Sequence, residues 1–193
     1  MTFRYPPGAT PLDPDEMDGL KLSHITMRTE LDRFEASNIR DAEQWAFGRK
    51  HADLLSTDFI RMLHKKMFGM VWKWAGTYRK SEKNIGVISW NISTEMHQLC
   101  GNAQAWLEYA TYPPDEMAAR FHHMLVKIHP FPNGNGRLAR IMADLVLVSL
   151  DQPRFSWGKD NLSFDTAVRQ TYIQALRSAD NHDYTPLLDF VRS

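Results

Sequence analysis

The stretch at residues 138–148 most constrains how this chain can fold, because almost every residue in it is apolar. An α-helix that is apolar nearly all round has to be surrounded by other elements. The sequence therefore predicts a buried central helix with the rest of the chain packed around it. The length of 193 residues is sufficient for one domain with such a core.

The segments around this stretch carry apolar residues at the three- and four-residue steps of amphipathic helices. Such helices are predicted near residues 31–46, 56–68, 96–107, 115–129, 164–176 and 186–191. Residues 77–93 differ, because β-branched and aromatic side chains flank the turn residues Asn84 and Gly86. The expected fold class is all-α, that is, mostly α with one small β-hairpin.

Residues 1–20 contain four prolines and two glycines, so they are expected to form a Pro-rich arm. The remainder, residues 21–193, is expected to be a single domain. Cys100 is the one cysteine of the sequence, which excludes an intramolecular disulfide and fits a reducing compartment. No targeting segment opens the chain and no apolar stretch is long enough to span a membrane, so a cytoplasmic location is expected.

The charge balance argues against nucleic acid as a partner. Lys and Arg total 23, as do Asp and Glu, so the formal net charge is zero. Nucleic-acid-binding proteins usually carry a basic excess, which disfavours a DNA-binding accessory of a mobile element. Four tryptophans could form a stacking platform for a nucleic-acid base, namely Trp72, Trp74, Trp90 and Trp106. Packing in the core explains them better, except at Trp90.

The stretch at residues 129–140, directly before the central helix, carries the strongest chemical pattern. Asparagine and glycine alternate at residues 133–136, and these residue types allow successive backbone N–H groups to form an anion-binding nest. The nest opens onto a helix N-terminus, which favours a phosphate. Arg137 and Arg140 oppose the helix dipole there, so they are expected to bind a polyphosphate.

His129 ends the preceding predicted helix and faces the same loop. A neutral imidazole can accept a proton from an attacking hydroxyl group. A base, a phosphate nest and two arginines within twelve positions favour phosphoryl or nucleotidyl transfer. The structural alternative is a helix–loop–helix turn in which the histidine is a cap and the arginines are solvated. Nearby, His122 and His123 point about 100° apart on a helix, so they cannot chelate one metal ion.

This stretch resembles the Fic (Fic/Doc) motif H-x-F-x-(D/E)-G-N-G-R-x-x-R. The matching positions are His129, Phe131, Gly134, Asn135, Gly136, Arg137 and Arg140. The surrounding segments resemble a Fic core over about residues 45–150, which implies a helical bundle around the central helix. The whole chain, including the arm, resembles the bacterial Fic relatives called mobile mystery protein B.

The resemblance implies an enzyme, a protein adenylyltransferase that moves AMP from ATP to a Ser, Thr or Tyr hydroxyl of a protein. By that similarity His129 is the base, Phe131 anchors the loop and Arg140 takes the γ-phosphate. The resemblance also implies that the α- and β-phosphates are bound by Gly134, Asn135, Gly136 and Arg137. The hairpin is the flap that positions the target by strand addition, through Lys83, Asn84, Ile85, Gly86 and Val87.

The chain departs from the family pattern at Asn133, where the family has an Asp or Glu that holds Mg²⁺. A neutral amide oxygen is a weaker magnesium ligand than a carboxylate, so Mg²⁺ is expected to be held weakly, with Asn133 as its ligand. The alternative is a catalytically weak or lapsed Fic fold that binds nucleotide or a partner protein. Another phosphate-containing donor is a further alternative.

Fic proteins are often restrained by a helix with the motif (S/T)-x-x-x-E-(G/N), whose Glu pairs with the second motif arginine. Thr26 and Glu30 match its first part, but Leu31 follows. Glu35 is an equally plausible inhibitory residue. The alternative for both Glu30 and Glu35 is an ordinary exposed carboxylate on a helix. A separate regulatory partner is also possible on the sequence alone.

Overall fold

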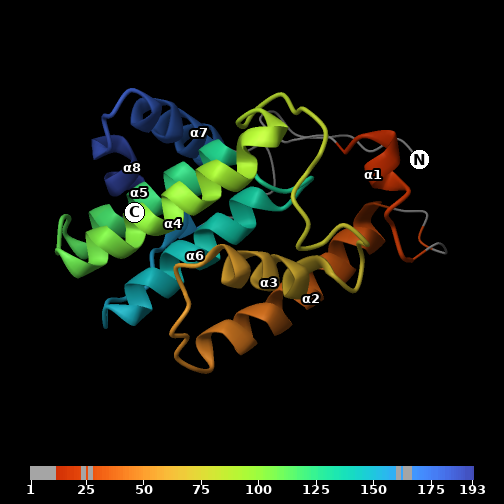
Figure 1. Ribbon diagram of the computed structural model, residues 1–193, viewed down its shortest axis with the longest axis horizontal. Helices are drawn as coiled ribbons and strands as arrows, with labels where there is room; N and C mark the ends of the chain where they lie inside the picture. The colour runs from red at the N-terminus through yellow and green to blue at the C-terminus, as the bar shows by residue number, and fades with distance from the viewer. Residues whose placement is uncertain (1–11, 23–24, 26–27, 160–161, 163–166) are drawn as a thin grey trace.

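The computed structural model describes residues 12–22, 25, 28–159, 162 and 167–193. Most of the Pro-rich arm, and Thr26 of the inhibitory motif, therefore lie outside the described residues. Figure 1 shows the elements in order, and they are α1 (Pro14–Met17), α2 (Arg28–Phe47), α3 (Thr57–Phe68), η1 (Ser89–Asn91), α4 (Ile92–Glu108), α5 (Pro114–Ile128), α6 (Asn135–Ser149), η2 (Trp157–Lys159), α7 (Ala167–Asp180) and α8 (Thr185–Arg192).

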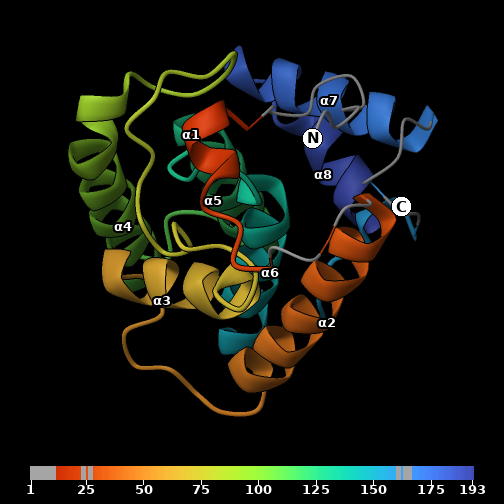
Figure 2. The ribbon, with the colours of Figure 1, turned by 90° about the vertical axis from the view of Figure 1, so that its right-hand side faces the viewer.

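The prediction of a central buried helix is confirmed. Helix α6 runs through the middle of the molecule in both views, with the other long helices around it (Figures 1 and 2). Ten of its fifteen residues are buried. Its most extensive contact is with α5, while α2 packs on α3 and α7 on α8. Large aromatic side chains fill the space between these helices: Phe59, Phe68, Trp72, Phe121 and Phe131.

The all-α fold class is confirmed, but the small hairpin predicted within residues 77–93 is not formed. Over this described segment the chain makes an irregular loop that ends in the 3₁₀ helix η1. Its backbone groups bond to the end of α5 instead of to each other: the Arg79 N–H donates to the Pro130 carbonyl at 2.9 Å and the Val87 N–H to the Ile128 carbonyl at 3.3 Å. Hydrogen bonds to the carbonyls of residues 128 and 130 thus take the place of the expected strand pairing.

The described part of the N-terminal segment lies against the loop that follows α3. Leu20 and Trp72 form an isolated antiparallel bridge, and the Lys21 N–H donates to the Val71 carbonyl at 2.8 Å. The indole N–H of Trp74 donates to the Glu16 carbonyl at 3.0 Å. Residues 12–21 are therefore packed onto the domain. Across the described chain, no helix combines the length and apolar character needed to cross a membrane.

Candidate active site

His129 lies where α5 ends, in the left-handed conformation with φ 54° and ψ 59°. This conformation turns the chain sharply out of the helix and into the loop that leads to α6. The residue is only 6% exposed, and burial lowers the pKa of its imidazole to about 4. The side chain is therefore neutral near pH 7, as a proton acceptor must be.

The loop after His129 is held rigidly by the Asn135 side chain. Its Oδ1 accepts from the Phe131 N–H at 2.9 Å, and its Nδ2 donates to the Phe131 carbonyl at 2.8 Å. The Phe131 ring is fully buried, as expected for an anchor, and stacks on the His64 ring with centroids 3.8 Å apart. The amide of Asn135 thus stabilises the loop, and its backbone N–H belongs to the first turn of α6.

At the start of α6 the backbone turns at Gly134, within the stretch where the sequence predicts a nest. Gly134 is the N-cap with φ 80°, and a Cβ atom on it would lie 2.5 Å from the Phe68 ring, so only glycine fits. This N-cap makes no side-chain hydrogen bond to the helix. The first N–H groups of α6 thus have no capping side chain, which leaves the positive end of the helix dipole suited to a phosphate.

Asn133 is turned back onto the loop. Its Oδ1 accepts from the Gly134 N–H at 2.7 Å and from Nη2 of Arg137 at 3.3 Å. A neutral oxygen already shared by two donors fits poorly as a magnesium ligand. Among the described residues there is also no group of three or more His, Cys, Asp or Glu side chains arranged to hold a metal ion. The protein groups at this site therefore do not fit a protein-held Mg²⁺.

Arg137 is paired with Glu35 of α2. Its Nη1 lies 2.8 Å from Oε2 of Glu35, and its guanidinium lies 4.7 Å from the centroid of the Phe68 ring. The other carboxylate oxygen of Glu35 accepts from the Trp72 indole N–H at 2.7 Å. The Glu35 side chain is 7% exposed, so it is not the exposed carboxylate of the alternative reading.

The identity of the paired arginine differs from the expectation. The resemblance implied that an inhibitory glutamate would pair with Arg140, but Glu35 pairs with Arg137, one turn earlier on α6. Glu30, five residues earlier on α2, is partly buried and makes no ion pair with either motif arginine in the described structure.

Arg140 has a different environment. Together with Arg137 it lines a cavity of about 250 Å³ between α2 and α6, which also contacts Glu43, Asp144 and Arg154. Burial lowers the pKa of Arg140, and its interaction with the neighbouring Tyr172 opposes that shift. None of the ion pairs among the described residues includes Arg140. The two arginines thus lie together as predicted, and Arg140 is the one without a carboxylate partner in this part of the chain.

The flap residues lie beside His129, although they form no strand. A Cβ atom on Gly86, which has φ 108°, would lie 2.7 Å from the His129 Cβ atom. Asn84 and Ile85 are exposed. Lys83 does not face outward, because its side chain is 2% exposed and its Nζ lies 2.8 Å from Oδ2 of Asp13 and against the Glu16 carboxylate. Lys83 therefore fastens the flap to the segment around α1.

Two further residues at the site were missed by the sequence analysis. His64 accepts from the Gly76 N–H at Nδ1 (2.9 Å), so its Nε2 carries the proton and donates to the Asn133 carbonyl at 3.0 Å. Burial lowers the pKa of His64 to about 3. Arg79 donates to the His129 carbonyl at 2.7 Å. The sequence offers a signal for His64, which shares the apolar face of α3 with Ile60 and Phe68 and so needs buried polar partners. It offers none for Arg79, because the residues that follow it, 80–83, are all polar.

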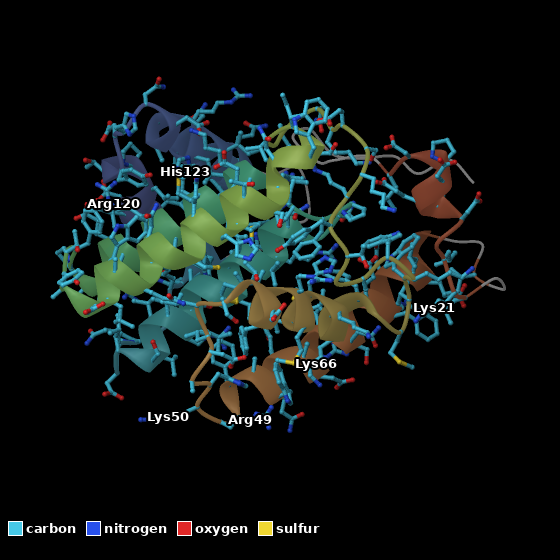
Figure 3. All side chains as sticks on the ribbon, in the orientation of Figure 1. Lys21, Arg49, Lys50, Lys66, Arg120 and His123 are labelled. Carbon is cyan, nitrogen blue, oxygen red and sulfur yellow. The ribbon has the colours of Figure 1, made fainter. Side chains whose placement is uncertain are left out.

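The two adjacent histidines of α5 contact side chains of the C-terminal helices. His122 Nε2 lies 2.9 Å from the Tyr172 hydroxyl, whereas His123 contacts the Tyr184 hydroxyl at 2.9 Å and Oδ1 of Asp180 at 3.0 Å. Figure 3 labels His123 on the side of α5 that faces α7 and α8. The two histidines therefore bond to different partners.

Comparisons with known proteins identify a family and several relatives of the chain. Residues 54–147 match the family model described as Fic/DOC family. The chain is 30% identical over 148 residues to the protein adenylyltransferase fic-1 of Caenorhabditis elegans, covering 74% of this chain and 27% of that protein. It is 26% identical over 143 residues to the protein adenylyltransferase Fic of Aedes aegypti, covering 72% of this chain and again 27% of the relative.

Solved structures share the fold. The N-terminal Fic domain of the effector Bep8 from Bartonella sp. 1-1C superposes with a TM-score of 0.71 at 13% identity, covering 91% of this chain and 90% of that one. That similarity, at such low identity, shows the fold alone. The chain spans about a quarter of the length of the adenylyltransferases it matches.

Proposed function

This chain belongs to the Fic/DOC family over residues 54–147, and from that membership we propose that it transfers AMP from ATP to a hydroxyl group of a protein. The observation that carries the proposal is the arrangement around one loop. A buried, neutral His129 ends α5, and six residues later α6 begins at an uncapped N-terminus with two arginines in its first turns.

The proposed reaction uses this arrangement directly. The oxygen of a Ser, Thr or Tyr hydroxyl attacks the α-phosphorus of ATP, and the bond from that phosphorus to the bridging oxygen of pyrophosphate breaks. The neutral imidazole of His129 accepts the hydroxyl proton, and pyrophosphate leaves. The backbone N–H groups at residues 135 and 136 stabilise the negative charge that develops on the phosphate oxygens, whereas the Gly134 N–H donates to Oδ1 of Asn133.

The arginines bind the phosphates that leave. Arg137 contacts the β-phosphate and Arg140 the γ-phosphate, each by charge-assisted hydrogen bonds. Arg140 is suited to this role because, among the described residues, no ion pair with a carboxylate holds it. Arg137 is held by the Glu35 carboxylate in the described structure, so it has to exchange this partner for phosphate. We therefore propose that Glu35 restrains nucleotide binding.

A second candidate function is supported by Asn133. Its amide oxygen is engaged by Gly134 and Arg137, and no carboxylate of the loop replaces it as a metal ligand. Without a metal-binding carboxylate the phosphate charge of the transition state is stabilised less. A Fic fold that binds nucleotide or a partner protein, with little or no transfer, is consistent with that environment, as is transfer from another phosphate-containing donor.

Labelled nucleotide distinguishes these functions. The protein and its Glu35→Gln variant are incubated with a cell lysate and either α-³²P-ATP or γ-³²P-ATP. Adenylyl transfer labels protein only from the α-phosphate, and His129→Ala abolishes the label. His97→Ala, an exposed histidine on α4, is the matched control and keeps it. Label from γ-³²P-ATP alone would refute adenylyl transfer, and ATP binding without any label would favour the binding function.

A further inference from the structure

Arg79 is a buried cation that lies between the flap and the loop of His129. It follows α3 in the chain, and its side chain is 0% exposed. Its ion-pair partner in the described structure is Glu82, whose carboxylate is 3.7 Å away and 56% exposed. So distant and well-solvated a carboxylate does little to offset the desolvation of a buried guanidinium. The guanidinium must therefore be stabilised mainly by other groups.

Those other groups are backbone carbonyls from two segments of the chain. Nε donates to the carbonyl of His129 at 2.7 Å. Nη1 donates to the carbonyl of Ser81 at 2.8 Å, and Nη2 donates to the carbonyl of Val87. Ser81 and Val87 lie at the two ends of the flap. One side chain therefore fixes both ends of the flap to the carbonyl of the residue proposed as the base.

The backbone on either side reinforces this connection. The Arg79 N–H donates to the Pro130 carbonyl, and the Val87 N–H donates to the Ile128 carbonyl. Between these points the flap crosses closely over His129 at Gly86. A Cβ atom there would lie 2.7 Å from both Nη2 of Arg79 and the His129 Cβ atom. The flap, Arg79 and His129 thus form one closely packed unit.

From these contacts we infer that Arg79 is a positioning residue, which sets the flap and His129 at a fixed separation so that a hydroxyl group presented on the flap meets the imidazole. The inference rests on the proposed function. A planar guanidinium is required because its donors diverge toward three carbonyls at once, whereas an ammonium group cannot span them. Arg79 has no part in the nest, so nucleotide binding does not depend on it.

The test replaces Arg79 with lysine and measures amide hydrogen exchange, which needs no activity. Arg79→Lys should accelerate exchange of the amides at residues 83–88 by at least about tenfold, because the flap loses its anchor. The amides of α5 and α6 should exchange as in the native protein. Arg61→Lys is the matched control, since Arg61 also donates to a backbone carbonyl, that of Gly76 at 3.1 Å, but lies before the flap.

The kinetic arm measures transfer from α-³²P-ATP to the target protein. Arg79→Lys should lower kcat by about tenfold or more, because small displacements of reacting groups have large effects on rate. The dissociation constant of ATP should stay within about twofold of the native value, since the α6 nest is unchanged. If the native protein proves inactive, the proposed function fails, while the exchange measurement still decides whether Arg79 holds the flap.

A second variant, Gly86→Ala, perturbs the contact between Arg79 and the flap through a flap residue. Gly86→Ala places a methyl group against Arg79 and His129, so it should accelerate exchange of the same amides even if Arg79→Lys fails to fold. Native exchange rates at residues 83–88 in either folded variant would overturn the inference. Faster exchange spread evenly over α5 and α6 would also overturn it, because Arg79 would then stabilise the whole domain rather than position the flap.

Discussion

Replacing Glu35 with glutamine should make ATP bind more tightly and make the protein less stable. The Glu35 carboxylate accepts from Arg137 with one oxygen and from Trp72 with the other. Glutamine has the same shape but a single acceptor oxygen, so one of the two donors loses its partner. The charge that holds Arg137 is removed as well. Affinity and stability are therefore expected to change in opposite directions.

The magnitude follows from the burial of the pair. Arg137 is 27% exposed and Glu35 is 7% exposed, at a separation of 2.8 Å. A hydrogen bond to a charged group contributes about 1.5–3 kcal/mol, and partial exposure of Arg137 favours the lower end of that range. ATP must displace this interaction when its β-phosphate binds Arg137. Since about 1.4 kcal/mol corresponds to tenfold in affinity, Glu35→Gln should lower the dissociation constant of ATP by about tenfold.

Calorimetry with ATP, together with thermal unfolding, measures both effects. Glu30→Gln is the matched control on the same helix and should leave ATP affinity unchanged. Trp72→Phe removes the indole donor but leaves the ion pair with Arg137, so it should lower the melting temperature without raising ATP affinity. An ATP affinity of Glu35→Gln equal to the native value, with a lower melting temperature, would refute the reasoning and make Glu35 a structural residue.

Two other perturbations test the site. Burial lowers the pKa values of His64 and His122 to about 3 and of His129 to about 4. The unfolded chain therefore binds more protons than the folded protein between about pH 3 and 6.5, so the free energy of unfolding should fall as the pH drops from 6.5 toward 3. Equal melting temperatures at pH 7 and pH 5 would contradict this. Asn133→Asp should raise Mg²⁺-dependent transfer by about tenfold, which requires only about 1.4 kcal/mol of transition-state stabilisation. A magnesium titration of both proteins checks this, and a variant no faster than an active native protein would refute the metal argument.

Much of the fold could be predicted from the sequence because it depends on local pattern. The apolar stretch of α6 and the three- and four-residue steps of α3, α4 and α5 are properties of single segments, and each segment buries most of its predicted apolar residues. Met62 and Leu107 are the exceptions, since both are exposed. The motif loop is also local, since Gly134 needs its positive φ wherever the loop turns into α6. Local pattern therefore located the central helix and the loop in which the phosphate nest is predicted.

The flap could not be predicted in the same way. Its β-branched and aromatic residues suggested that the segment pairs with itself, but the strongest donor in it is Arg79, whose partners include the carbonyl of His129, fifty residues later. Ile85, Ile88 and Trp90 are exposed instead of alternating between two faces. A sequence pattern reports the propensity of a segment, whereas here a distant carbonyl decided its conformation.

The same physical limit applies to regulation of the site. Glu35 looked like one of two candidate carboxylates on an amphipathic helix, and only the fold shows that it is buried between Trp72 and Arg137. A carboxylate withdrawn from water at this position is stable only while both donors remain. A phosphate that takes Arg137 therefore leaves Glu35 half-satisfied, so binding of nucleotide should loosen α2 at its contact with α6. Faster amide exchange in α2 around residue 35 on addition of ATP would demonstrate this loosening. Unchanged exchange at saturating ATP would show that the ion pair between Arg137 and Glu35 persists while the nucleotide is bound.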